Sequence, residues 1–81
     1  MAYSVHGSMV TQTPDEIRYE VVEDPREPGW ILVLPLADLD AAWVESSTRG
    51  ALDHGSIIVR SLAVREFEAC GRWPPTVSRF S

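Results

Sequence analysis

The sequence predicts a small α+β domain in which a β-hairpin is followed by a helix, a short strand and a second helix (β-β-α-β-α). Residues 17–21 alternate between apolar and polar, and residues 30–34 form a continuous apolar run, as expected of two strands. Apolar residues then recur at helical spacing in two later segments. The chain has 81 residues, of which 44% are hydrophobic and 23% charged, so it is expected to form one globular domain.

The N-terminal segment, residues 1–14, is rich in Ser, Thr and Gly and shows no apolar period. We therefore expect a flexible N-terminal arm, followed by a compact domain over residues 15–72. Within that domain, the two runs are predicted to pair as an antiparallel hairpin. The break between them contains Pro28 and Gly29, which favour a turn.

A first helix is predicted after the hairpin. Pro35 ends the second strand and can open a helix at its first turn. Leu36, Leu39 and Trp43 follow at helical spacing, and Gly50 is a suitable end. The acidic residues of this segment are expected to face solvent.

The C-terminal third is predicted to hold a strand, a helix and a tail. Residues 57–59 are β-branched and apolar, which favours a short buried strand. Ser61 can cap a helix over residues 62–70, and Gly71 is expected to end it. Residues 73–81 begin with Trp-Pro-Pro and are expected to form either a Pro-containing tail or a short helix.

No catalytic, cofactor or metal site is predicted, so we expect a non-enzymatic protein. His6 and His54 have no second His or Cys at metal-ligand spacing, and the chain has no Lys to complete a phosphate-binding loop. Asp53 beside His54 is expected to be hydrated loop rather than a catalytic pair. The single cysteine, Cys70, excludes an internal disulfide, and we expect it to be a buried structural thiol.

A cytoplasmic protein without a membrane anchor is expected. The longest apolar run, residues 30–36, is far shorter than the roughly 18 to 20 residues that a membrane span needs. The N-terminus has neither the basic nor the apolar region of a signal peptide. All seven basic residues are Arg, and Lys and Asn are absent, which fits a GC-rich bacterial or phage genome.

The net charge of −5 is unevenly distributed. Residues 1–45 hold nine acids and two Arg, which gives −7, whereas residues 46–81 hold five Arg and three acids, which gives +2. Ordinary surface solvation is one explanation. The other is an acidic hairpin that binds a basic protein surface, because complementary charge speeds and orients such an encounter. The residues predicted to bind the partner are Glu20, Glu23, Asp24, Glu27 and Trp30.

The small size of the chain also favours a partner. A chain this short buries only about 60% of its unfolded surface, so its core is marginal. Its seven aromatic residues are a generous supply for such a core, so a homodimer is also expected. A third alternative is a purely structural subunit of a larger assembly, which would have a symmetric interface around Trp30 or Trp43. We therefore predict a small bacterial or phage regulatory protein that acts by binding another protein.

An alternative function follows from the last residues. Residues 70–80, Cys-Gly-Arg-Trp-Pro-Pro-Thr-Val-Ser-Arg-Phe, resemble the turn and recognition helix of helix-turn-helix repressors, in which Thr-Val-Ser-Arg begins five residues after a turn Gly. Glu66 and Phe67 depart from the pattern, which has an apolar and a small residue there. The resemblance, which covers residues 62–81, implies a DNA-binding transcriptional regulator. The residues that it implies at the DNA are Arg72, Thr76, Ser78 and Arg79.

Overall fold

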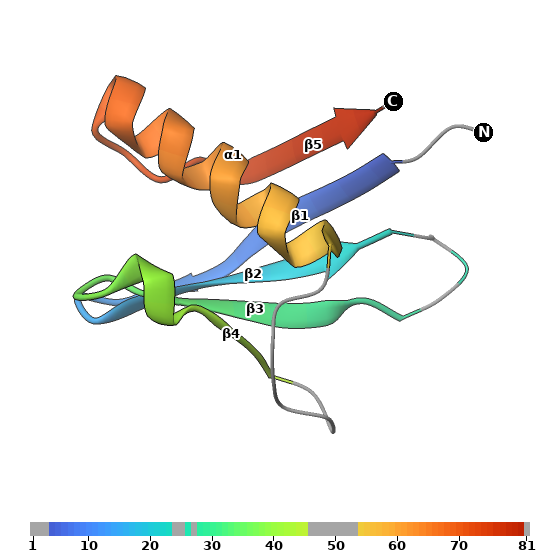
Figure 1. The fold of residues 1–81 in the computed structure, drawn as a ribbon, viewed down its shortest axis with the longest axis horizontal. Coiled ribbons are helices and arrows are strands. Elements are labelled where there is room, and N and C mark those ends of the chain that lie inside the picture. The colour runs from blue at the N-terminus through green and yellow to red at the C-terminus, as the bar shows by residue number, and fades with distance from the viewer. Residues whose placement is uncertain (1–3, 24–25, 27, 46–53, 81) are drawn as a thin grey trace.

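Over the residues that it describes, the computed structural model shows a five-stranded antiparallel sheet with one helix packed on one face (Figure 1). It describes residues 4–23, 26, 28–45 and 54–80. The strand order is β4-β3-β2-β1-β5. The elements are β1 (Ser4–Gln12), β2 (Glu16–Val22), β3 (Trp30–Pro35), a 3-10 turn (Leu39–Ala41), β4 (Trp43–Glu45), α1 (His54–Cys70) and β5 (Thr76–Phe80). The α+β class is therefore as predicted.

The predicted hairpin is confirmed as β2 and β3. The two strands pair antiparallel, with Tyr19 opposite Leu32 and Val21 opposite Trp30. Because residues opposite one another in a sheet share a face, the alternating run of β2 directs its apolar side chains to the same side as those of β3.

The core lies between α1 and the face of the sheet that it covers. Each strand from β1 to β4 contributes side chains, and α1 adds those that recur at helical spacing. The buried apolar residues of this core are Val5, Ile17, Tyr19, Val21, Leu32, Leu34, Val44, Val59, Ala63 and Trp73. Where α1 packs on β1, a Cβ on Gly7 would lie 2.8 Å from Cγ1 of Val59, so the glycine allows the two elements to pack.

The prediction of a flexible arm over residues 1–14 is wrong, because Ser4–Gln12 is strand β1. It pairs antiparallel with both β2 and β5, so it lies inside the sheet. Val5, Gly7 and Met9 alternate toward α1, and Gly7 lies against Val59 of the helix. Because this position is a glycine and its neighbours include Ser and Thr, the apolar–polar alternation of a strand cannot be recognised in the sequence.

The helix predicted after Pro35 is also wrong. Asp38 instead caps a single 3-10 turn by accepting a hydrogen bond from the Asp40 backbone N–H (3.1 Å), and the chain then extends into β4. Val44 of β4 pairs with Leu32 and enters the core. An aromatic and a β-branched residue side by side favour a strand, and pairing with β3 overrides the helical spacing. Gly50 lies outside the described residues.

The strand predicted at residues 57–59 belongs to α1, which runs unbroken from His54 to Cys70. Ser56, Val59 and Ala63 recur at helical spacing on its buried side. Packing of this stripe on the sheet overrides the β-branched preference of the Ile-Ile-Val run. The predicted helix end is confirmed. Gly71 adopts a left-handed φ of 77° and its N–H donates to the Phe67 carbonyl (2.7 Å).

The C-terminal segment returns to the sheet as β5. Thr76–Phe80 pairs antiparallel with β1, so the recognition helix predicted as one state of residues 73–81 does not form. Just before the strand, Trp73 is buried and stacks on Phe67, with ring centroids 4.6 Å apart. The strand is anchored by this aromatic pair and by the ladder to β1.

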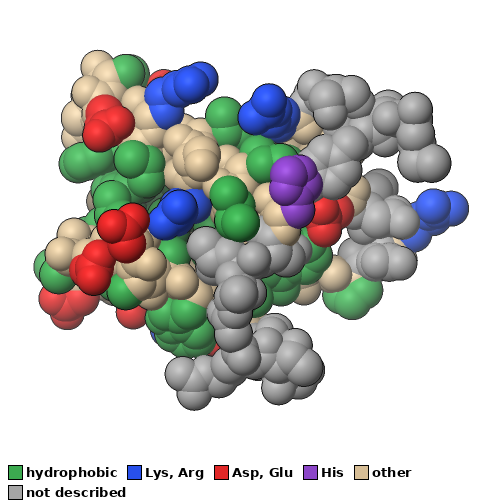
Figure 2. Space-filling view, viewed as in Figure 1, with side chains coloured by type: hydrophobic (Ala, Val, Ile, Leu, Met, Phe, Trp, Pro, Cys, Tyr) green, Lys and Arg blue, Asp and Glu red, His purple; other side chains and the backbone are tan. Residues whose placement is uncertain are grey.

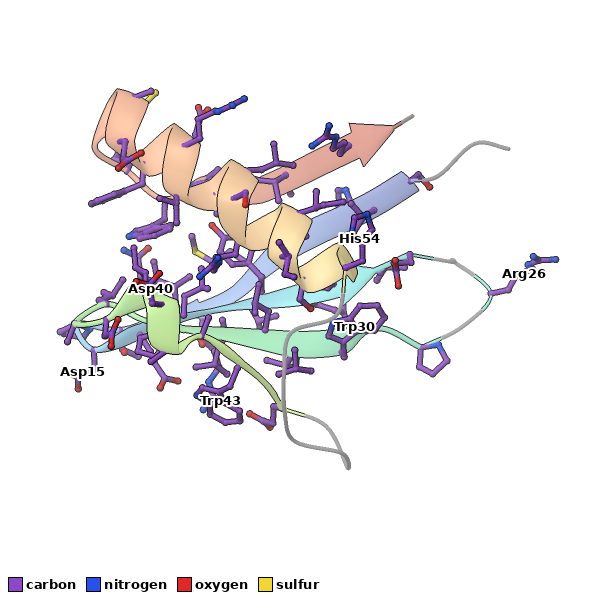
Figure 3. All side chains as sticks on the ribbon, in the orientation of Figure 1. Asp15, Arg26, Trp30, Asp40, Trp43 and His54 are labelled. Carbon is purple, nitrogen blue, oxygen red and sulfur yellow. The ribbon has the colours of Figure 1, made fainter. Side chains whose placement is uncertain are left out.

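Two partly buried hydrogen bonds connect the helix and its C-terminal connection to the sheet. The indole Nε1 of Trp30 donates to Oγ of the fully buried Ser56 (2.6 Å), beneath the start of α1 (Figure 3). The hydroxyl of Tyr19 donates to the carbonyl of Pro74 (2.6 Å). Burial raises the pKa of Tyr19 to about 12, because removal from water penalises the charged phenolate.

Candidate protein-binding face

The sheet has a second face that no described element covers. Along β2, β3 and β4, the side chains that alternate with the core residues lie on this side, since Arg18 is opposite Val33 and Val33 is opposite Trp43. We call this surface the open face. It consists of Glu16, Arg18, Glu20, Ile31, Val33, Trp43 and Glu45.

Carboxylates dominate the charge of the open face. Arg18 at its centre forms salt bridges through Nε with Glu16 (2.5 Å) and through Nη1 with Glu45 (2.6 Å), which raise the pKa of Arg18. These contacts link β2 to the edge strand β4. Glu20 is exposed and forms no salt bridge with a described residue. Three carboxylates therefore face one guanidinium, and the surface is acidic.

The open face also has an apolar centre. Val33 is fully buried although it lies on the face opposite α1, and its neighbours in register are Arg18 and Trp43. Trp43 and Ile31 are half-buried. Aromatic and aliphatic side chains surrounded by charged ones are typical of protein-binding surfaces.

The residues predicted from the acidic hairpin do not form one surface. Glu20 lies on the open face. Glu23 lies against the first turn of α1, where a Cβ on Gly55 would be 3.1 Å from its Oε2, and a carboxylate is favoured at a helix N-terminus. Trp30 faces α1 through its bond to Ser56. Asp24 and Glu27 lie outside the described residues.

The residues implied at DNA lie on strand β5 and in the segment before it, not on one face of a helix. Thr76 and Ser78 are on the side of the sheet opposite α1, whereas Arg79 is on the α1 side, opposite Val5. Arg72 is exposed between α1 and β5. DNA binding by these four residues stays a prediction, without the helix that the resemblance requires.

Two polar contacts were missed by reasoning from the sequence. His6 Nδ1 and Ser78 Oγ are 2.6 Å apart across β1 and β5, a proximity that only the correct assignment of both strands could have predicted. Cys70 is exposed rather than buried, as are all residues of α1 from 65 to 70. Its Sγ donates to Glu66 Oε1 (3.6 Å). Among the described residues, no three His, Cys, Asp or Glu side chains gather as metal ligands. Asp53 is outside the described part of the chain.

Comparisons with protein-family models, curated proteins and solved structures gave no match. In the part of the chain that the structure describes, no helix has the length and apolar character to cross a membrane. The geometry of the open face is therefore the basis for the functional proposal.

Proposed function

We propose that this chain is a small, non-enzymatic regulatory protein that binds a basic surface of a partner protein through its open face. The observation that carries the proposal is the composition of that face, in which exposed carboxylates surround Trp43 and Ile31. The proposal keeps an acidic binding surface, as predicted on the hairpin, but assigns it to the open face of β2, β3 and β4.

The geometry favours recognition over mere solvation. Arg18 forms salt bridges with Glu16 and Glu45. Side chains that are already paired before a partner arrives lose less entropy on binding. Glu20 is the exposed carboxylate left to meet a partner's Arg or Lys. The apolar side chains beside it supply area that can be buried.

Affinity capture from a GC-rich bacterial lysate, with the purified chain as bait, tests the proposal. The bait Glu20→Arg reverses charge on the open face, and Glu68→Arg makes the same change at an exposed position of α1. We expect one protein retained by the original chain and by Glu68→Arg but lost with Glu20→Arg, because like charges would then meet at the interface. Capture that is equal for all three baits, or no specific capture, contradicts the proposal.

A further inference from the structure

The outer edge of β5 borders a groove that separates this strand from α1. In the described part of the chain, β5 pairs with β1 alone, so its other edge has no neighbouring strand. The groove has a volume of about 400 Å³. Leu62, Arg65 and Glu66 of α1 line one side, and residues 74–78 line the other.

The backbone of β5 presents hydrogen-bonding groups to this groove. The N–H of Met9 donates to the carbonyl of Pro75 (2.8 Å), which makes residue 75 a hydrogen-bonded position facing β1. Residues alternate in an antiparallel ladder, so Val77 also directs its backbone to β1. Thr76 and Ser78 therefore direct their N–H and C=O groups to the outer edge, where a further strand can pair with them.

This edge lacks most of the usual protection against strand addition. Natural proteins guard edge strands with charged side chains, Pro, bulges or very short length, and Arg79 is the one charged residue of β5. The opposite edge strand, β4, has only three residues, whereas β5 has five, without Pro or Lys and without a shift in its register with β1.

From this geometry we infer that an extended acidic segment of a partner protein adds to β5 as a sixth strand. Arginines around the groove favour a segment that carries carboxylates. Arg65 lines the groove, Arg79 lies on the α1 side of the strand, and Arg72 precedes it. None of the three forms a salt bridge with a described residue, and Glu66 is the acid nearby. Figure 2 shows basic side chains along the margin where α1 and β5 lie.

The same charges argue against a second copy of this chain as the occupant. An antiparallel pair of β5 strands related by a two-fold axis would bring the arginines of both copies to one interface. Like charges placed together at an interface oppose association. An incoming strand with carboxylates and aliphatic side chains toward α1 instead meets the arginines, Leu62 and Val77. This strand addition uses a surface separate from the open face and does not depend on the function proposed above.

Titration of the ¹⁵N-labelled full chain with a capped synthetic peptide tests the inference. The probe alternates Thr with Val or Glu, and the control peptide has Lys in place of Glu. We expect amide shifts at Thr76, Ser78 and Leu62, slower hydrogen exchange at the first two, and about tenfold weaker binding of the Lys peptide. The inference is overturned by no shifts with millimolar Glu peptide, by shifts on the open face instead, or by equal affinity for both peptides.

Variants of the edge separate backbone pairing from general surface effects. Ser78→Pro removes an N–H that β1 does not use, and Pro is tolerated where the N–H faces solvent. We expect loss of peptide binding with Ser78→Pro and retention with Ser78→Ala, which removes only the side-chain contact with His6. Unchanged binding by a folded Ser78→Pro chain contradicts the inference.

Charge reversal provides a test that does not depend on the proline variant folding. Arg65→Glu should exchange the preference, so that the Lys peptide binds better than the Glu peptide. Arg26→Glu makes the same change in the segment between β2 and β3, far from β5 (Figure 3), and should leave the preference intact. The same preference in all these chains would contradict selection of the segment by the charge of Arg65. Concentration-dependent self-association that Ser78→Pro abolishes would show that a second copy of the chain occupies the edge.

Discussion

Tyr19 couples the centre of the sheet to the C-terminal connection through one hydroxyl. Its ring is fully buried, and its O–H satisfies the carbonyl of Pro74 just before β5 begins. Tyr19→Phe keeps the ring but leaves that carbonyl without its donor, so we expect a loss of about 1–3 kcal/mol in the free energy of unfolding. Urea denaturation measures it. A change below about 0.3 kcal/mol would show that the hydrogen bond does not contribute.

The same hydroxyl predicts a pH dependence. The pKa of Tyr19 in the folded chain, about 12, is above its ordinary value of 10. The stability associated with the neutral phenol is therefore complete below about pH 10 and lost as the pH rises from about 10 through 12. We expect Tyr19→Phe to remove this contribution, leaving a shallower pH dependence. Equal slopes for the two chains in that window would contradict the assignment.

Gly7 marks the contact between β1 and α1. A Cβ here would approach Val59 to 2.8 Å, and the branched side chain has little freedom to move. Gly7→Ala should therefore destabilise the chain by about 1–3 kcal/mol, and Val59→Ala in the same chain should relieve part of the loss. A thermodynamic cycle of the two substitutions measures the coupling. Ser8→Ala is the matched control, and additive effects would place the strain elsewhere.

At the level of elements, the sequence predicts those that are set by local pattern. The alternation around Tyr19, the apolar run after Trp30 and the helix end at Gly71 all appear in the structure as predicted. The remaining assignments depend on partners distant in the chain. Trp43 follows earlier apolar residues at helical spacing, but in the structure Trp43 and Val44 pair with β3. Val59 follows two β-branched residues in the sequence, but it packs as part of a helix.

For the same reason, only part of the open face could be predicted from the sequence. The excess of acid before residue 46 is visible in the sequence, but the face on which each acid lies depends on the register of β2, β3 and β4. Glu20 could be placed from the alternation of its strand. The contact of Glu45 with Arg18 could not, since it needed β4 where a helix was expected.

Strand β1 gives the sharpest test at this scale. It is the neighbour of both β2 and β5, so deletion of residues 1–12 leaves β5 unpaired and exposes the core. We expect that truncated chain to lose its cooperative thermal transition. Deletion of residues 1–3 retains every β1 pair, from Ser4 onward, and should leave the transition in place. If the chain without residues 1–12 still folds cooperatively, the result supports the prediction that residues 1–14 form a flexible arm.

At the level of the whole molecule, the open face and the groove beside β5 differ in their prevailing sign of charge. The open face carries carboxylates from the acidic half of the sequence, and the β5 edge carries arginines from the basic half. One small sheet thus offers a face and an edge with opposite preferences. The overall charge of −5 describes neither surface.

The most direct test of protein binding by the open face is the affinity of the captured partner for three forms of this chain. Titration calorimetry at low salt should show Glu20→Arg weakened by about tenfold or more, and Glu68→Arg within about twofold of the original chain. The difference should shrink as salt screens the charges. Equal affinities for Glu20→Arg and the original chain would contradict the assignment of the binding surface to the open face.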